Sequence, residues 1–285
     1  MISAKIIADS IANNVRLTTI ELNYPRFIHS EFMTHRMFSR NASSSRAIPV
    51  EKMLEQVQQN PAMPIHWGKN QPGMQAREEI EYIDTAKYRW TLAAEQAIIY
   101  ATKLNSMKLH KQVVNRLLEP FQYIKIIVTA TEWDNFFKLR LHEDAQPEIQ
   151  ELAKCMKEAM DASVPEELEH GEWHLPYISK DDWSGLSFGN YTIEDLLKSS
   201  VARCARVSYL NHDNTNPNIE KDLELASKLL KDGHMSPFEH VATPMKHIHY
   251  TECEQRWEKG ITHTDIMSRQ WSGNFRGFLQ YRQLL

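Results

Sequence analysis

The sequence has only three cysteines in 285 residues, Cys155, Cys204 and Cys253, and no CxxC pair. So few and so scattered, they exclude a disulfide framework, and without paired thiolates structural zinc is not expected. We expect these cysteines to be small buried hydrophobic side chains. Any catalysis is therefore expected to use other residue types.

Long apolar runs are also missing. No stretch approaches the roughly 20 residues that a membrane span needs, and the opening MISAKIIADS lacks the basic start and apolar stretch of a secretory signal. We therefore expect no membrane partner and a cytoplasmic location. A net charge of −4 gives no general attraction to nucleic acid, so no nucleic-acid partner is expected and any anion-binding site must be local.

Three common motifs are absent, namely GxGxxG, the P-loop and GxSxG. Rossmann oxidoreductases, P-loop kinases and α/β-hydrolases thus lack their markers. The remaining composition, 42% hydrophobic and 25% charged, is that of an ordinary globular protein. With no repeat or low-complexity linker, we expect one α/β (α+β) catalytic domain over residues 1–285, with a mixed sheet and a bundle containing a long helix.

Apolar periodicity and helix-end signals predict the elements of the first half. In chain order they are a strand over 15–24, a short mixed segment over 26–36, a loop over 37–49, a Pro/Gly-rich loop over 60–73, a long helix over 74–104, a helix over 110–119, a strand or buried helix over 121–133, a helix over 134–142 and a helix that starts at Pro147.

The second half carries clear helix-end signals. Thr192 is typical of an N-cap and predicts a helix to about Arg206, while Gly233 ends a helix over 219–231. Ser236, followed by proline, predicts another N-cap. Residues 165–190 are expected to be loop-like and residues 250–285 irregular and aromatic-rich.

Hydrogen-bond donors crowd into residues 34–46, THRMFSRNASSSR. Arginine offers a planar fork of donors suited to phosphate, and serine and backbone amides add neutral donors. The stretch predicts either a site for a phosphate or a flavin pyrophosphate, or a solvated polar loop. Its candidate binding residues are His35, Arg36, Asn41, Ser43, Ser44, Ser45 and Arg46.

Two further stretches are candidates. In DNFFKLRLHEDAQPEIQ, the candidates are Asn135, Arg140, His142, Asp144 and Gln146. Spacings of five and four place some of them near one helical face, as a ligand site with Arg140 beside Asn135 or as an exposed helix end. In HMSPFEH, free amides after Ser236 suit an anion, and Glu239 lies between two histidines. That spacing matches no zinc pattern, so no metal site is expected.

Together these stretches resemble the flavin-dependent thymidylate synthases, the thymidylate synthase complementing protein family. Their signature RHRxxSxNxxSxR stands here as THRMFSRNASSSR, with only Thr34 departing from it. SSVARCARVSY (199–209) and LLKDGHMSPFEH (229–240) are similar to the RAARVS and HGHxTPFEH segments. NRLLEP (115–120) and residues 135–150 are similar to the segment that ends in LRxxxxAQxEI.

The order of these blocks differs from that of the family. There the ARVS and PFEH blocks precede the loop that carries the arginine-rich signature, which is residues 34–46 here and is called the arginine-rich loop below. Here they follow it by some 150 residues, which implies a circular permutation of the family fold, a change that proteins tolerate when the original termini lie close together. The single domain then divides into a strand and binding loop (1–50), a helical part (74–163), and a permuted segment with a C-terminal tail (191–285).

The resemblance implies reductive methylation of dUMP to dTMP, with FAD as cofactor and NADPH and methylenetetrahydrofolate as co-substrates. It also implies a homo-oligomer, in this family usually a tetramer. The cysteines agree with this chemistry, because none follows a proline as the nucleophile of the cysteine-dependent enzyme does.

The resemblance also assigns roles to residues. Catalysis falls to Ser44 and Arg140. Substrate binding falls to Glu31, Ser44, Ser45, Arg46, Arg116 and Arg140. Cofactor binding falls to His35, Arg36, Asn135, Ser208, Ser236 and Glu239.

Besides Thr34, three positions depart from the family pattern: Glu31 replaces a glutamine, Ala42 an acidic residue and Asp144 a histidine. A carboxylate in place of an amide removes two donors. Hydroxymethylation of dUMP or dCMP therefore stays open as an alternative. So do a non-catalytic nucleotide- or nucleic-acid-binding relative and, more remotely, a metallohydrolase built on the histidines.

Overall fold

The structure is a computed structural model that describes residues 1–207, 216–247, 249 and 257–285. Its centre is a five-stranded sheet in the order β3-β4-β2-β1-β5. The strands are β1 (Ser3–Ala12), β2 (Val15–Pro25), β3 (Ser39–Ala42), β4 (Tyr123–Ala130) and β5 (Glu166–Glu167). The pairs are antiparallel except β1 with β5, so the sheet is mixed, as predicted.

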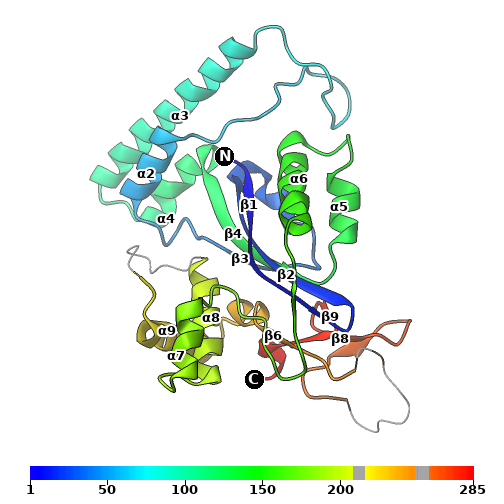
Figure 1. Cartoon of the computed structure of the whole chain (residues 1–285). Coiled ribbons are helices and arrows are strands. Elements are labelled where there is room, and N and C mark those ends of the chain that lie inside the picture. Colours follow the sequence, from blue (N-terminus) through cyan, green and yellow to red (C-terminus); the bar gives the residue numbers. More distant parts are fainter. Residues whose placement is uncertain (208–215, 248, 250–256) are drawn as a thin grey trace.

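The sequence left residues 121–133 open between strand and buried helix, and β4 is a strand buried on both faces. The side chains that β2 and β4 place on one face, such as Ile20 and Val128, pack against α5 (Asp134–Arg140) and α6 (Pro147–Asp161). Figure 1 shows both helices on that side of the sheet. The predicted start of α6 at Pro147 is confirmed.

The opposite face is covered by later parts of the chain. There Ile127 of β4 packs against Cys204 of α8 (Ile193–Arg206). Thr192 caps α8 in a capping box with Asp195, as its sequence predicted. α8 packs on α9 (Ile219–Lys231), whose bounds match the prediction. Within the region expected to be loop-like, α7 (Lys180–Ser187) forms a short helix.

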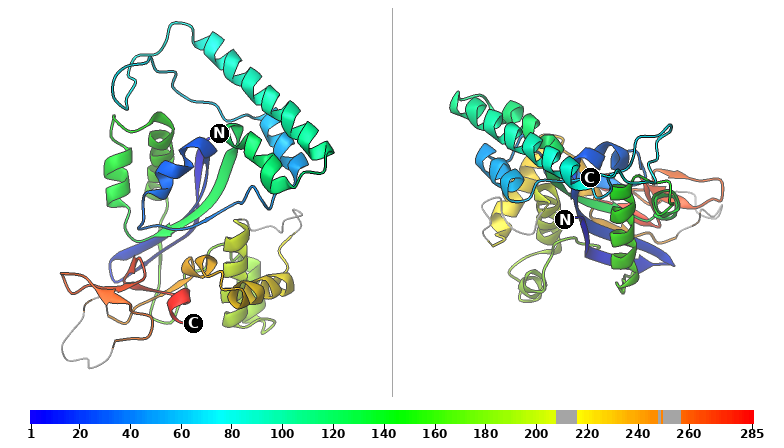
Figure 2. Two further views of the ribbon diagram at one scale, coloured as in Figure 1. Left: turned by 180° about the vertical axis from the view of Figure 1, so that it is seen from behind. Right: turned by 90° about the horizontal axis from the view of Figure 1, so that it is seen from above.

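A helical part lies at the far end of the sheet (Figures 1 and 2). It consists of α2 (Val50–Gln59), α3 (Ile83–Ser106), α4 (Lys111–Val114) and the 3₁₀ helix η2 (Asn115–Phe121), which share one apolar core. The predicted start of the long helix at residue 74 is wrong, because residues 68–80 fold back as an extended pair, with Lys69 N–H donating to the Glu78 carbonyl.

The predicted helix over 110–119 is also corrected, since only its first turn is α-helical. Pro120 has no N–H to donate, and the side chain of Asn115 bonds to the arginine-rich loop, so the chain tightens into η2. Two shorter pieces, η1 (Arg26–Ile28) and α1 (His29–Met33), lead from β2 into that loop.

The last part of the chain contains more strand than expected. Residues 263–280 form β7 (His263–Thr264), β8 (Gln270–Ser272), β9 (Phe275–Arg276) and β10 (Phe278–Gln280), and β10 pairs with β6 (Ala242–Pro244). The final turn is η4 (Tyr281–Gln283). The expectation of an irregular tail is therefore wrong for this stretch.

The ARVS and PFEH blocks lie beside the arginine-rich loop, although they follow it in the chain by some 150 residues. Both α8 and η3 (Ser236–Glu239) pack against β3, the strand inside the predicted loop over 37–49. The sequence missed β3 because SRNA has no apolar alternation. The packing brings the four similar blocks into one region.

Candidate active site

The first turn of the arginine-rich loop and α5 enclose a pocket of 210 Å³. Phe38 and Phe136 form its apolar side, with ring centroids 5.4 Å apart. Its lining residues are Thr34, His35, Arg36, Met37, Phe38, Glu132, Asn135, Phe136, Leu139 and Arg140. Four of the predicted site residues, His35, Arg36, Asn135 and Arg140, therefore share one cavity.

His35 and Arg140 are joined directly across this pocket. The Nε of Arg140 donates to Nε2 of His35 at 2.9 Å, and its Nη2 lies 3.5 Å from the hydroxyl of Thr34. Burial, together with the positive charges of Arg140 and Arg40, lowers the pKa of His35 to about 4. The imidazole is neutral near pH 7, and because Nε2 accepts, its proton sits on Nδ1. The guanidinium keeps its remaining donors for the pocket.

Arg40 fixes the loop that carries His35. Its Nη1 donates to the carbonyls of Met33, at 2.9 Å, and His35, at 3.0 Å. These bonds satisfy carbonyls at the end of α1, where no helical partner is available. This role of Arg40 was not predicted from the sequence. The sequence signal that could have indicated it is the position of Arg40 between the signature residues Ser39 and Asn41.

The other end of the loop is held by Glu119. Its Oε1 accepts from the hydroxyl of Ser45 at 2.9 Å and from Arg116 at 2.8 Å, and it pairs with Arg26 at 3.0 Å. Ser45 is buried and its hydroxyl is bonded to Glu119, while its role in substrate binding stays a prediction. Glu119 could not be singled out from the sequence, because its three partners come from different elements.

Arg46, Arg116 and Ser44 are exposed next to this anchor. The amide of Asn115 donates to the carbonyls of Ser45, at 2.7 Å, and Ile48, at 3.1 Å, and so fixes the backbone around Arg46. The backbone N–H of Arg46 donates to Ser44 Oγ at 3.3 Å. The loop therefore presents the guanidinium of Arg46, and the neighbouring η2 presents that of Arg116, which also pairs with Glu119. Guanidinium groups of this kind suit a phosphate.

Of the three candidate residues in the later blocks, the structure describes Glu239 and Ser236. Glu239 bonds to Arg282 near the C-terminal end of the described chain, so its carboxylate already has a cationic partner. Ser236 is exposed and is not an N-cap: Met235 holds that position, without a side-chain bond, and η3 has only four residues. The predicted cap is wrong by one residue, because the turn already starts at Ser236 and Pro237 is its second residue. Ser208 lies outside the described residues.

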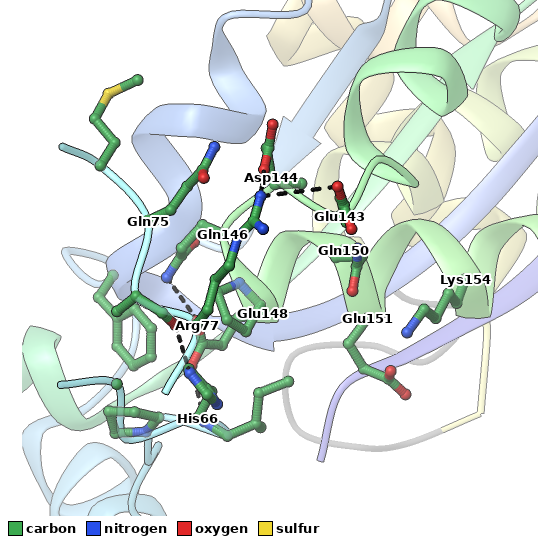
Figure 3. Close-up of a pocket in the computed structure, with 18 of the residues that line it drawn as sticks. His66, Gln75, Arg77, Glu143, Asp144, Gln146, Glu148, Gln150, Glu151 and Lys154 are labelled. Atoms are coloured by element: carbon green, nitrogen blue, oxygen red, sulfur yellow. Dashed lines mark hydrogen bonds and ion pairs between the residues drawn. The ribbon is translucent and has the colours of Figure 1, made fainter. Parts of the chain in front are cut away.

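A larger cavity of 780 Å³ lies between residues 64–77 and the start of α6 (Figure 3). Arg77 reaches across it toward Glu143 and Asp144, at 3.8 and 3.4 Å. Four carboxylates, those of Glu143, Asp144, Glu148 and Glu151, face only two cations, Arg77 and Lys154. This charge opposes a flavin or nucleotide phosphate, so the smaller arginine-lined pocket is the better candidate.

A profile of the thymidylate synthase complementing protein family matches residues 9–166, more than half of the chain. The chain belongs to this family. The match contains the arginine-rich loop, Arg116 and Arg140, whereas the ARVS and PFEH blocks lie beyond it.

Solved structures were also compared. A UMP/dUMP methylase, PolB from Streptomyces cacaoi, bound with 5-Br dUMP, is 16% identical, with 56% of this chain and 90% of that chain covered and a TM-score of 0.48. The flavin-dependent thymidylate synthase ThyX from Helicobacter pylori, complexed with FAD and dUMP, is 18% identical, with 50% and 67% covered and a TM-score of 0.37. A search of curated proteins finds no match.

Two further properties bear on alternative functions. Within the part of the chain that the structure describes, no three His, Cys, Asp or Glu side chains are arranged to hold a metal ion. None of the helices in that part has the length and apolar character needed to cross a bilayer.

Proposed function

We propose that this protein catalyses reductive methylation of dUMP to dTMP, with FAD as cofactor and NADPH and methylenetetrahydrofolate as co-substrates. The observation that carries the proposal is the hydrogen bond from Arg140 to His35. It joins the signature loop to the LRxxxxAQxEI block, 105 residues later in the chain. Family membership supplies the reaction type for this arrangement.

The residues around the pocket suit a flavin. Arg36 and Arg140 provide positive charge, His35 is neutral, and Phe38 and Phe136 provide an apolar wall. An isoalloxazine ring needs such a mixture of apolar contact and a few polar groups. His35, Arg36 and Asn135 would hold the flavin, with Ser208, Ser236 and Glu239 contributing from the later blocks. Bound flavin would supply the reducing hydride.

The nucleotide would lie between the two ends of the loop. Arg46 and Arg116 would hold its phosphate, with Ser44 adding a hydroxyl donor. Arg140 would meet the pyrimidine edge, where its donors stabilise negative charge as it develops on the ring. Glu31, one turn before Thr34 on α1, is the candidate for contacts on the nucleotide side.

We further propose that the active enzyme is a homo-oligomer, in keeping with the family's usual tetramer. A pocket of 210 Å³ is smaller than the 300–1,000 Å³ of typical ligand sites, so a second subunit is expected to complete it. α3 supports this: of its 24 residues only Ala94 and Ala101 are buried, and Tyr88 and Tyr100 are 61% and 56% exposed.

The single catalytic domain over 1–285 and the circular permutation remain part of the same proposal. The packing of α8 and η3 on β3 supports the permutation, because it returns the displaced blocks to the loop they precede in the family. Family members in the usual order would have these blocks on the N-terminal side of the loop.

The decisive experiment incubates FAD-loaded protein with dUMP, methylenetetrahydrofolate and NADPH and identifies the nucleotide by mass spectrometry. A methyl gain is expected in the wild type and is lost in Arg140→Ala. Arg77→Ala, which changes an exposed arginine at the other cavity, is the matched control and should retain activity. A hydroxymethyl gain would favour the alternative that Glu31 and Ala42 motivate. No product from dUMP or dCMP would refute the catalytic proposal and favour a binding protein.

A further inference from the structure

A line of buried hydrogen bonds crosses the sheet and ends at the signature residue Asn41. It begins at Ser10, whose hydroxyl lies 2.8 Å from Nδ1 of His174, and Nε2 of His174 lies 2.7 Å from the hydroxyl of Thr19. Thr19 and Thr129 are register partners on β2 and β4, with their hydroxyl oxygens 2.7 Å apart.

The line continues to the arginine-rich loop. The hydroxyl of Thr129 lies 2.8 Å from Nδ1 of His240, and Nε2 of His240 lies 3.3 Å from Oδ1 of Asn41. His240 is the last residue of the PFEH block, and Asn41 is on β3. Ser10, Thr19, Thr129, His174 and His240 are all buried, so each polar atom depends on its neighbour in the line.

The two histidines allow the direction of the line to be worked out. A neutral imidazole has one donor and one acceptor nitrogen. If Nε2–H of His240 donates to Asn41 Oδ1, its Nδ1 accepts from Thr129, Thr129 accepts from Thr19, and Thr19 accepts from Nε2–H of His174. The Nδ1 of His174 then accepts from Ser10. Every group in the line is satisfied with this one polarity.

We propose that this relay is a positioning device: it holds the carbonyl oxygen of Asn41 inward and so presents its amide N–H groups to an acceptor oxygen of the bound flavin or pyrimidine nucleotide. The inference rests on the proposed function. Among the described residues no acceptor is recorded for Nδ2 of Asn41. Thr19, Thr129, His174 and His240 act through Asn41 and touch no ligand themselves.

The protonation states support this polarity. Burial lowers the pKa of both His174 and His240 to about 3, so both are neutral near pH 7. A neutral ring next to an acceptor oxygen must place its proton on the facing nitrogen. The relay therefore transmits a fixed orientation from β1 to the loop without carrying charge.

Substitution at Thr129 tests the relay from a position remote from any ligand. Thr129→Val removes the hydroxyl at nearly constant volume, and Thr129→Ser keeps it. Kd values for FAD and for dUMP are measured separately. The ligand whose Kd changes is the one that accepts a hydrogen bond from Asn41. We expect Thr129→Val to weaken one of them about fivefold, the effect of one net hydrogen bond, and Thr129→Ser to resemble the wild type.

A double-mutant cycle separates positioning from general damage. In an Asn41→Ala background, Thr129→Val should have no further effect on affinity. Asn41→Asp keeps the acceptor for His240 but removes the N–H donors, so it should weaken binding as much as Asn41→Ala. Additive losses in the cycle, or full affinity in Asn41→Asp, would overturn the proposal.

The tautomers supply a test that needs no variant. In ¹⁵N-histidine NMR of the wild-type protein, both buried rings should carry their proton on Nε2, and a proton on Nδ1 of either would overturn the polarity. Wild-type protein that binds neither FAD nor dUMP would refute the proposed function and the ligand part of this inference together. Wild-type binding with equal affinity in Thr129→Val and Thr129→Ser would refute the relay alone.

Discussion

The buried histidines His174 and His240 predict a steep loss of stability in mild acid. Both rings lie in the centre of the molecule, and burial lowers the pKa of each to about 3 in the folded state. Among the described residues, the carboxylate of Asp9 acts on His174 and opposes this shift, and His174 acts on His240. In the unfolded chain a histidine has a pKa near 6.5. Between these values the unfolded chain binds more protons than the folded one.

The sign and size of the effect follow from this difference. Stability from the two histidines is complete above about pH 6.5 and is lost progressively as the pH falls toward 3. Each pKa unit corresponds to about 1.36 kcal/mol. From pH 6.5 to pH 5 each ring therefore lowers the free energy of unfolding by about 2 kcal/mol, and the pair lowers it by about 4 kcal/mol. That is a large part of the 5–15 kcal/mol typical of a folded protein.

Urea unfolding at pH 7, 6 and 5, at one protein concentration, measures this loss. His240→Gln keeps an N–H donor for Asn41 but cannot titrate, so it should remove about half of the pH dependence. His142→Gln changes an exposed histidine and is the control, with the wild-type slope expected. A wild-type loss below about 1 kcal/mol between pH 7 and pH 5 would refute the reasoning.

Three further substitutions test other parts of the structure. Asp222→Ala leaves buried Arg203 and Arg206 without their shared carboxylate, and should cost about 3–5 kcal/mol in urea unfolding; a cost under 1 kcal/mol would contradict this. Gly233→Ala should lower the free energy of unfolding by about 1–2 kcal/mol, because Gly233 follows α9 with a left-handed φ of 73° that alanine adopts only with strain. No neighbouring atom crowds the added Cβ, so the backbone alone accounts for this cost, and Asp232→Ala serves as control. Arg46→Ala should weaken dUMP binding about 10- to 100-fold without change in stability, against an unchanged Kd in Arg77→Ala.

Helices with local end signals could be predicted from the sequence. α9 has the predicted bounds because Asn218 caps its start and Gly233 ends it, and both signals are local. The start of α3 at Ile83 could not be predicted, since residues 74–82 suit a helix locally. Their pairing with residues 67–69 is a tertiary contact that overrides the propensity.

The candidate site divides in the same way. The donors of residues 34–46 are visible in the sequence, and so is the possible link between Asn135 and Arg140. The anchors are not: Glu119 collects partners from three elements, and His240 meets Thr129 from 111 residues away. Such positions lack a short-range pattern, because the fold rather than the spacing brings them together.

The three departures from the family pattern do not have equal weight for the reaction. Asp144 follows α5, pairs with Arg77 at the larger cavity and does not line the pocket that contains Arg140. Glu31 and Ala42, in contrast, lie at the two ends of the segment that carries His35 and Asn41. Of these three, Glu31 and Ala42 are therefore the candidates for a change of product, beside Thr34, which lines the pocket and lies 3.5 Å from Arg140. If the assay yields a hydroxymethyl nucleotide, restoring the glutamine at 31 and the acidic residue at 42, rather than the histidine at 144, is expected to return the product to dTMP.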